Sequence, residues 1–209
     1  MKHYFISAIG TDSGKTLVSS IVTEALRADY WKPVQTGSIR DTDTVRSLIS
    51  NSKTVFHPEA YHLPEPLSPH AAAQLAGVQI ELQKINLPNT DNALVIEGAG
   101  GLLVPLNQHD YVVDVAQHLQ AEVILVANLY LGSINHTLLS IRELERRQAE
   151  NGLKVAGIIF NHSPVPASEE IILAKTSFPC LLKISTEPEP NRATVSKYAA
   201  ILAKVLAAK

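Results

Sequence analysis

Short apolar segments alternate with longer amphipathic segments along most of the chain. We predict strands where β-branched and other apolar residues cluster, over residues 3–8, 31–34, 93–97, 122–127, 154–160 and 180–184. We predict helices where apolar residues recur on one helix face, over residues 15–28, 43–50, 69–76, 110–119, 134–149, 168–176 and 191–207. This alternation predicts an α/β fold with a mostly parallel central sheet and helices on both faces.

Residues 51–70 interrupt the alternation, because their prolines at positions 58, 64, 66 and 69 disfavour a helix before residue 69. We expect an ordered surface excursion there. Two other segments, residues 93–96 and 123–126, are continuously apolar, which is typical of central parallel strands. Ligands of such folds bind beyond the carboxyl ends of the strands, so the residues that follow each strand are the candidates for function.

Composition and charge exclude several classes of protein. A length of 209 residues favours one domain, residues 1–209. The net charge of −2 and the lack of a basic stripe argue against nucleic-acid binding. A single cysteine, Cys180, cannot form an internal disulfide, which suits a reducing compartment. No apolar run approaches the ~18 residues of a membrane span, and the first run is too short for a signal peptide. We therefore expect a cytoplasmic protein without a membrane partner.

The sequence AIGTDSGKT, residues 8–16, lies between the first predicted strand and the first predicted helix. Backbone N–H groups of such a turn point at anionic oxygens. Lys15 adds a positive charge, and Thr16 offers a hydroxyl to Mg²⁺. Ile9 stands where the strict motif has glycine. The alternative is an ordinary glycine turn, but the flanking strand and helix favour a P-loop NTPase-like fold that binds a nucleoside triphosphate.

Polar residues follow the second predicted strand and open the next helix. Lys32 precedes Pro33, which favours an extended backbone at the lysine. Lys32 is either a functional lysine or a solvated lysine at the sheet edge. Asp41 and Asp43 begin the helical stretch, where an acidic residue either caps the helix or binds Mg²⁺. The sequence pattern alone leaves both choices open.

Glu97 directly follows the apolar residues 94–96, where a carboxylate is costly to bury without a partner. A metal ion is one natural partner, and the glycines at 98, 100 and 101 let the backbone approach a ligand closely. The alternative is a glycine-rich loop with an incidental glutamate. Asn161 follows another predicted strand and either contacts a purine edge or belongs to an ordinary turn. No Ser-His-Asp or Cys-His arrangement is recognisable in the sequence.

Six segments in order resemble the dethiobiotin synthetase family. They are GTDSGKT at residues 10–16, KPVQTG at 32–37, Asp43, EPLSPH at 65–70, EGAGG at 97–101 and LGSINH at 131–136. The resemblance spans most of the chain. It implies an ATP- and Mg²⁺-dependent ligase of biotin biosynthesis that joins 7,8-diaminononanoate and CO₂ into dethiobiotin, with release of ADP and phosphate. The implied intermediates are a carbamate and a carbamic-phosphoric anhydride.

The resemblance also implies the site residues by position. Lys32 matches the family's catalytic lysine, and Lys15 and Thr11 are implied to act with it. The implied Mg²⁺ ligands are Thr16, Asp43 and Glu97. The residues implied to contact ATP are Asp12, Ser13, Gly14, Lys15, Thr16, Leu17, Asp43, Glu97, Gly98, Ala99, Gly100, Asn161 and His162. Those implied to contact the diamine are Thr11, Asp12, Thr36, Leu131, Gly132 and Asn135, the last three across a homodimer interface.

Four features depart from the family pattern. Asp12 stands where glutamate is common, and both the stretch 82–92 and the stretch between the first predicted helix and Lys32 are short. Ile184-Ser185-Thr186 lacks the usual Ile-Pro step beside the base. The last departure leaves the choice of nucleotide base open.

Two other classes of protein fit parts of the pattern. A partitioning or adaptor ATPase shares the sheet, but it commonly carries an extra lysine near the start of the phosphate loop, where this chain has Ser7-Ala8-Ile9-Gly10. An amidotransferase-type synthase also activates a carboxylate with ATP, but it would usually carry a further domain.

Overall fold

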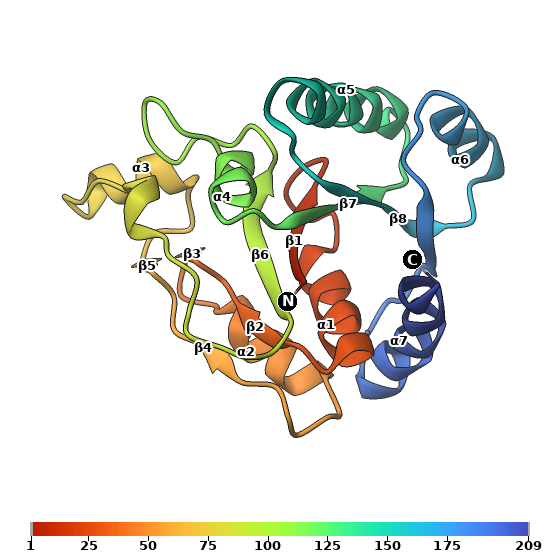
Figure 1. Cartoon of the computed structure of the whole chain (residues 1–209), viewed down its shortest axis with the longest axis horizontal. Helices are drawn as coiled ribbons and strands as arrows, with labels where there is room; N and C mark the ends of the chain where they lie inside the picture. The colour runs from red at the N-terminus through yellow and green to blue at the C-terminus, as the bar shows by residue number, and fades with distance from the viewer. Residues whose placement is uncertain (1, 209) are drawn as a thin grey trace.

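A parallel sheet forms the centre of the computed structural model, which describes residues 2–208. Its strands are β1 (His3–Ala8), β2 (Asp29–Trp31), β4 (Phe56–His57), β6 (Leu94–Gly101), β7 (Glu122–Asn128), β8 (Val155–Ser163) and β9 (Cys180–Ser185). Their spatial order is β4-β2-β6-β1-β7-β8-β9, and every pairing between these strands is parallel. Strand β1 is therefore central, and the loop that follows it lies in the middle of the sheet edge (Figure 1).

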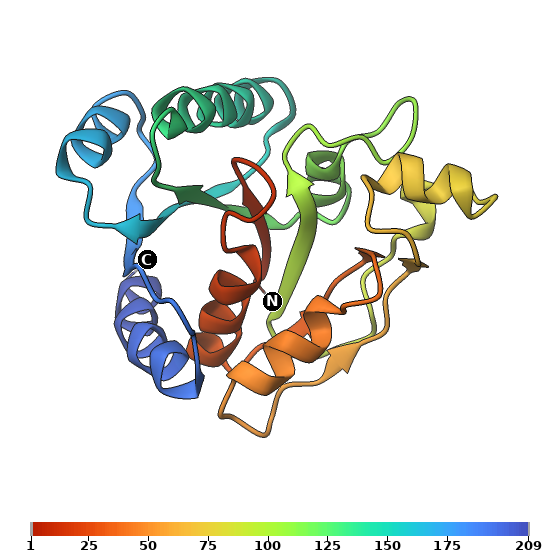
Figure 2. The ribbon, with the colours of Figure 1, turned by 180° about the vertical axis from the view of Figure 1, so that it is seen from behind.

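Helices cover both faces of this sheet (Figures 1 and 2). They are α1 (Lys15–Leu26), α2 (Asp41–Leu48), α3 (Pro69–Leu75), α4 (Val112–His118), α5 (Ser133–Asn151), α6 (Pro166–Leu173) and α7 (Arg192–Ala207). Helices α1, α2 and α7 share one apolar core with the sheet, and α3, α4, α5 and α6 share the other. The predicted α/β class with helices on both faces is confirmed.

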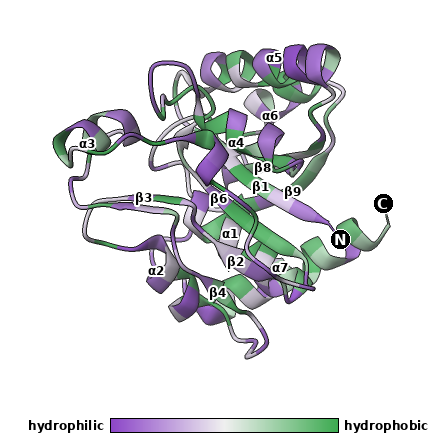
Figure 3. Ribbon diagram, turned by 60° about the vertical axis from the view of Figure 1, so that its left-hand side comes forward, coloured by the Kyte–Doolittle hydropathy of each residue, from purple (hydrophilic) through white to green (hydrophobic). Residues whose placement is uncertain are grey.

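Successive side chains of a strand point to opposite faces of the sheet, so each strand contributes residues to both apolar cores. In β1, Tyr4 and Ile6 pack in the core under α1, whereas Phe5 packs in the core on the opposite face. Burial on both faces explains why the central strands are continuously apolar rather than alternating. Figure 3 shows the same arrangement, with largely hydrophobic central strands and hydrophilic outer positions on helices such as α5.

The prediction of one strand over residues 31–34 is wrong. The chain forms β2, leaves the main sheet at Lys32 and Pro33, and then forms β3 (Val34–Thr36). Proline has no N–H to donate to a sheet, which accounts for the break. Strand β3 pairs with β5 (Tyr61–Leu63) in a separate two-stranded sheet. The excursion at 51–70 thus contains β4 and β5, which are too short to produce a recognisable sequence period.

Two boundaries differ from the predicted ones in ways that affect the site. Helix α2 begins at Asp41, two residues before the predicted start. Strand β6 continues through the glycines to Gly101, because Ala8 in β1 still pairs with Gly101. The short stretch before β6 contains a single 3₁₀ turn, Leu82–Lys84. Among residues 2–208, no helix combines the length and apolar character that crossing a membrane requires.

The close approach of β8 and β9 depends on Gly157. Its φ is +151°, and a Cβ there would lie 2.4 Å from the carbonyl oxygen of Pro179 and 2.8 Å from Cγ of Leu181. We predict that Gly157→Ala lowers the free energy of unfolding by ~3 kcal/mol, because overpacking adds to backbone strain. Urea denaturation would measure it.

Gly77→Ala is the matched control, because Gly77 also has a positive φ (+65°) but no atom within 4 Å of the place that a Cβ would occupy. It should cost only ~1 kcal/mol, the backbone contribution alone. Equal losses in the two variants would contradict the steric argument.

Candidate active site

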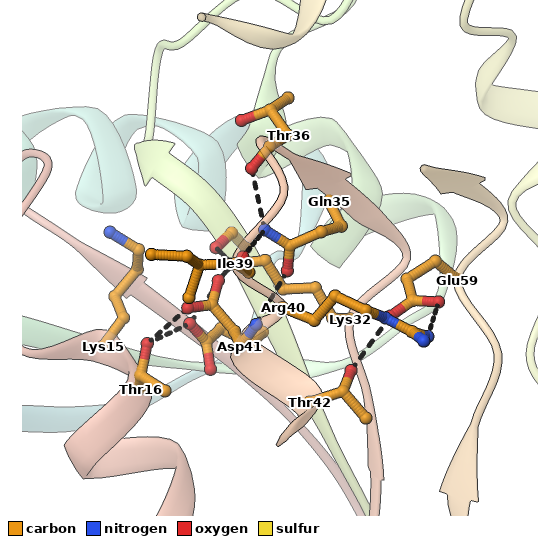
Figure 4. A network of polar contacts seen from close by, with 12 residues as sticks. Lys15, Thr16, Lys32, Gln35, Thr36, Ile39, Arg40, Asp41, Thr42 and Glu59 are labelled. Carbon is orange, nitrogen blue, oxygen red and sulfur yellow. Dashed lines mark hydrogen bonds and ion pairs between the residues drawn. The ribbon is translucent and has the colours of Figure 1, made fainter. Parts of the chain in front are cut away.

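Four side chains from distant parts of the sequence meet at the carboxyl end of the sheet. Lys32 Nζ lies 2.6 Å from Asp41 Oδ2 and 3.2 Å from Glu97 Oε1. Thr16 Oγ1 lies 3.1 Å from Asp41 Oδ1 and 3.0 Å from the same Glu97 oxygen. Figure 4 shows Thr16, Lys32 and Asp41 converging from α1, the β2–β3 connection and the start of α2. One lysine thus joins two carboxylates beside the phosphate loop.

Glu97 and Lys32 are buried, so their charged groups need these partners in place of water. Glu97 is only 1 % exposed and Lys32 only 4 %. The second Glu97 oxygen accepts a hydrogen bond of 2.9 Å from the Tyr30 hydroxyl, and Lys32 also donates to the carbonyl oxygen of Gly98 at 3.2 Å. Desolvation disfavours the charged lysine, but Glu97 and Asp41 outweigh it and raise the pKa of Lys32. The ammonium is therefore protonated at neutral pH.

The phosphate loop carries a second lysine in a different electrostatic setting. Gly14 adopts φ +91° at the N-cap of α1, and Lys15 is the first residue of that helix. Lys15 Nζ donates to the carbonyl oxygen of Gly10 at 3.3 Å. Desolvation, followed by repulsion from Lys32, lowers the pKa of Lys15. An anion bound at this helix N-terminus would favour the charged form, as expected of a phosphate-binding lysine.

The chemistry of the ligand atoms fits Mg²⁺. Thr16 has one hydroxyl proton, but carboxylate oxygens of both Asp41 and Glu97 lie within hydrogen-bond distance, so the proton can satisfy only one of them. In residues 2–208 no group of three or more His, Cys, Asp or Glu side chains could hold a metal ion. Mg²⁺ commonly binds to only one or two carboxylates and keeps waters and substrate phosphates as its other ligands. Thr16, Asp41 and Glu97 match that partial set.

The structure brings Asp41 into contact with Thr16 and Lys32 rather than Asp43, the aspartate that the resemblance implies, and the metal role of Asp43 stays a prediction. Asp43 is exposed on α2, and the contacts to Thr16 and Lys32 come from Asp41, the first residue of the helix. Residues two apart on a helix point in different directions. Both aspartates are candidates from the sequence, and only the backbone geometry at the start of α2 separates them. Tyr30, the buried partner of Glu97, carries no sequence signal.

A cavity of about 780 Å³ opens beside this group of side chains. It collects ten of the sequence-predicted site residues, namely Thr11, Asp12, Gly14, Lys15, Thr16, Lys32, Thr36, Glu97, Ala99 and Gly100. Its remaining lining includes apolar side chains from β3, the β3–α2 connection, the segment up to the start of α3 and the turn after β6, namely Val34, Ile39, Pro66, Leu67, Pro69 and Val104. The cavity therefore combines a charged end, with two lysines and three carboxylates beside the phosphate loop, and an apolar wall.

Several predicted site residues lie outside this cavity. Asn161 lies near the end of β8 and donates from Nδ2 to the carbonyl oxygen of Ser13 at 3.1 Å, so it packs on the phosphate loop. Its neighbour His162 is exposed, with φ +59°. Leu17, in the first turn of α1, and Gly98, against which Phe5 packs, also do not line the cavity. These positions surround the phosphate loop without forming the cavity wall.

The β7–α5 connection is also separate from the cavity. Leu131, Gly132 and Asn135 are all exposed, and Leu131 has essentially the accessibility of an isolated side chain. Tyr130 beside it is 48 % exposed. The contact of this connection with the diamine, implied by family resemblance, therefore has no counterpart within one copy of the chain.

Comparisons with known proteins point to one family. Residues 2–194 match the family model described as AAA domain. An ATP-dependent dethiobiotin synthetase BioD from Cytophaga hutchinsonii is 54 % identical over 201 residues, covering 95 % of this chain and 96 % of the relative. The corresponding protein of Christiangramia forsetii is 46 % identical over 200 residues, covering 95 % and 94 %.

A solved structure with low identity shares the fold. The putative plasmid partition protein of Borrelia burgdorferi bound to AMPPNP aligns with a TM-score of 0.57 at 13 % identity, covering 99 % of this chain and 98 % of that one. Its similarity supports the P-loop fold predicted from the sequence. At this identity it does not choose between a partition ATPase and a ligase.

The position of the two aspartates gives a direct test. We predict that Asp41→Asn weakens binding of magnesium–ADP at least tenfold, about 1.4 kcal/mol, because Asp41 contacts both Thr16 and Lys32. Asp43→Asn, the matched control two residues away, should change affinity less than about twofold. Isothermal titration calorimetry would measure both. A larger effect of Asp43→Asn would support the assignment of Asp43 implied by the resemblance and contradict that of Asp41.

Proposed function

The chain belongs to the ATP-dependent dethiobiotin synthetase family and is an ATP-dependent ligase of biotin biosynthesis, and we propose that it closes the ureido ring of dethiobiotin. The proposed substrates are 7,8-diaminononanoate, CO₂ and ATP, and the other products are ADP and phosphate. Besides family membership, one observation of the structure supports this reaction. Lys32 is buried, protonated and held between two carboxylates beside the phosphate loop, where an anionic intermediate would form.

The proposed reaction proceeds in three steps. One amine of the diamine attacks CO₂ and gives a carbamate. A carbamate oxygen then attacks the γ-phosphorus of ATP, which forms a carbamic-phosphoric anhydride and releases ADP. Finally the second amine attacks the carbamoyl carbon and expels phosphate, closing the ring. Each step requires two reactants to be held in line while negative charge develops, so positioning and electrostatic stabilisation carry the catalysis.

The residues of the cavity suit these roles. Lys32 and Lys15 present two ammonium groups to the transferring phosphoryl group, and α1 directs its N-terminal N–H groups to the same place. Thr11, Asp12 and Thr36 line the same cavity and are the proposed contacts for the carbamate and the diamine. No step requires a covalent enzyme intermediate, in keeping with the lack of a recognisable nucleophile in the sequence.

Mg²⁺ is the proposed metal, held by Thr16, Asp41 and Glu97. When bound, it would neutralise charge on the phosphate oxygens of ATP. Asn161 and His162, at the end of β8 beside the phosphate loop, are the proposed contacts for the base. The cytoplasmic location and the single-domain organisation over residues 1–209 belong to the same proposal.

Turnover would separate this function from that of a nucleotide-switched ATPase. Release of ADP should require both bicarbonate, as the source of CO₂, and the diamine. We predict that Lys32→Ala lowers kcat by ~10²-fold, about 2.7 kcal/mol of activation free energy, because the two carboxylates lose their buried counter-ion and the phosphoryl group loses one ammonium. A coupled assay for ADP would measure it.

Lys84→Ala is the control, since Lys84 is exposed and pairs only with Glu81 on the surface. Its kcat should stay within about twofold of the parent. ADP release that proceeds equally without the diamine would favour the switch ATPase, and normal turnover by Lys32→Ala would remove this lysine from the mechanism.

We also propose that the exposed β7–α5 connection meets a second copy of the chain and reaches its diamine site. Leu131→Glu should then shift the protein towards monomer in analytical ultracentrifugation. It should also raise the KM for the diamine about tenfold, ~1.4 kcal/mol, more than the KM for ATP. Leu75→Glu, on the exposed side of α3, is the control. A Leu131→Glu protein with unchanged mass and unchanged KM values would contradict the dimer.

A further inference from the structure

The connection between β3 and α2 leads directly to the carboxylate of the proposed metal site and buries no apolar side chain of its own. It spans residues 37–40, begins with Gly37 at φ +82° and exposes 80 % of Ile39. Asp41 follows directly as the first residue of α2. An exposed connection without apolar anchors would ordinarily sample several conformations. Polar contacts on either side must therefore fix the direction of the Asp41 carboxylate.

Gln35 provides the contacts on one side. Its side chain is buried, with 4 % of the residue exposed. Nε2 donates to the carbonyl oxygens of Thr36 at 2.8 Å and Ile39 at 3.1 Å, and Oε1 accepts from the backbone N–H of Asp41 at 3.0 Å (Figure 4). One side-chain amide thus bonds to the backbone at both ends of the connection and uses its donors and an acceptor at once.

Glu59 provides the contacts on the other side. It comes from the turn between β4 and β5, and its side chain is 5 % exposed. It accepts from Arg40 Nε at 3.2 Å and Arg40 Nη2 at 2.6 Å, and from Thr42 Oγ1 at 3.1 Å. Burial alone would raise the pKa of Glu59, but hydrogen bonds from Arg40 and Thr42 lower it. The acceptor is therefore a carboxylate with a two-point guanidinium contact, which is geometrically specific.

These hydrogen bonds hold the backbone and the neighbours of Asp41 and leave its carboxylate free for other contacts. Gln35 holds its backbone N–H, and Glu59 holds the side chains of the residues before and after it, Arg40 and Thr42. Figure 4 shows Gln35 and Glu59 approaching the start of α2 from two different directions. The carboxylate oxygens of Asp41 remain directed to Thr16 and Lys32. A rotation of the backbone at residues 40–42 would break the contacts on both sides.

We propose that Gln35 and Glu59 are positioning residues that together hold the start of α2 so that Asp41 faces Thr16 and Lys32. The inference rests on the proposed role of Asp41 in the reaction. Glu59 does not line the cavity, and the amide of Gln35, which does line it, is already bonded to the backbone at three points. Their substitution should therefore impair catalysis and magnesium binding only through Asp41.

A double-mutant cycle separates this role from a general effect on folding. Gln35→Met removes all three hydrogen bonds at nearly constant size, and Glu59→Gln removes the charge. Each should lower kcat about tenfold and weaken magnesium–ADP binding severalfold by calorimetry. In the Asp41→Asn background each should cost less than about twofold, because residues that act through one another are not additive. Thermal denaturation would confirm that every variant is folded.

Asp29→Asn is the control for a buried acidic network, since Asp29 is held by Thr90, Asn92 and His57 at the start of β2, away from the cavity. It should lower the melting temperature and leave kcat within about twofold. If Gln35→Met does not fold, Gln35→Glu retains an acceptor for the Asp41 N–H while removing the donors, and it takes its place in the cycle.

The outcomes separate this proposal from the function on which it rests. Equal losses from Gln35→Met or Glu59→Gln in the parent and Asp41→Asn backgrounds would overturn the positioning role. So would an impaired Asp41→Asn enzyme beside normal Gln35→Met and Glu59→Gln enzymes, which would leave the role of Asp41 intact. Normal turnover by Asp41→Asn would overturn both the positioning role and the proposed role of Asp41.

Discussion

The site depends on one carboxylate buried within the central strand β6. Glu97 is 1 % exposed, and a charge in that position is tolerated only with close partners. Lys32, Thr16 and Tyr30 supply them from three other segments of the chain. Because β6 lies between β1 and β2 in the sheet, the segments after those strands are brought to the same edge as Glu97. The strand order therefore determines which residues can meet, and the cost of burying Glu97 ensures that they do.

The two carboxylates beside Lys32 also explain why the pKa values of the two lysines shift in opposite directions. Lys32 is held by two carboxylates, which raise its pKa despite burial, so it is charged before any ligand arrives. Lys15 donates to a backbone carbonyl, and desolvation lowers its pKa although Glu97, Asp41 and Asp12 act against that change. A phosphate beside Lys15 would add a direct anionic partner, whereas Lys32 already has two. The two lysines are thus suited to different tasks, Lys15 to an arriving anion and Lys32 to holding the two carboxylates in place.

Many residues of this candidate site can be predicted from the sequence. Those whose position depends on the local direction of the backbone cannot. The phosphate loop and Glu97 are predictable because each directly follows a run of apolar residues, and a parallel sheet gathers such positions towards one edge. Asp41 and Asp43 cannot be separated from the sequence, because they are two residues apart and their directions depend on where α2 begins. Strands β4 and β5 have only two and three residues, too few to show a period. Tyr30 fits the apolar pattern of a strand, and its hydroxyl is recognised as a hydrogen-bond donor only when the structure places Glu97 beside it.

The start of α2 shows how a short connection in a small α/β domain can hold one side chain in a defined orientation. Residues 37–40 lack an apolar anchor, and lengthening the connection would have provided one only at an entropic cost. The chain instead closes it with a side-chain amide from the preceding strand and a carboxylate from the β4–β5 turn. Strand β3 carries Gln35, and its partner β5 follows the turn that carries Glu59, so the small β3–β5 sheet fixes the distance between these two contacts. The excursion that interrupts the α/β alternation is therefore part of the framework that orients Asp41.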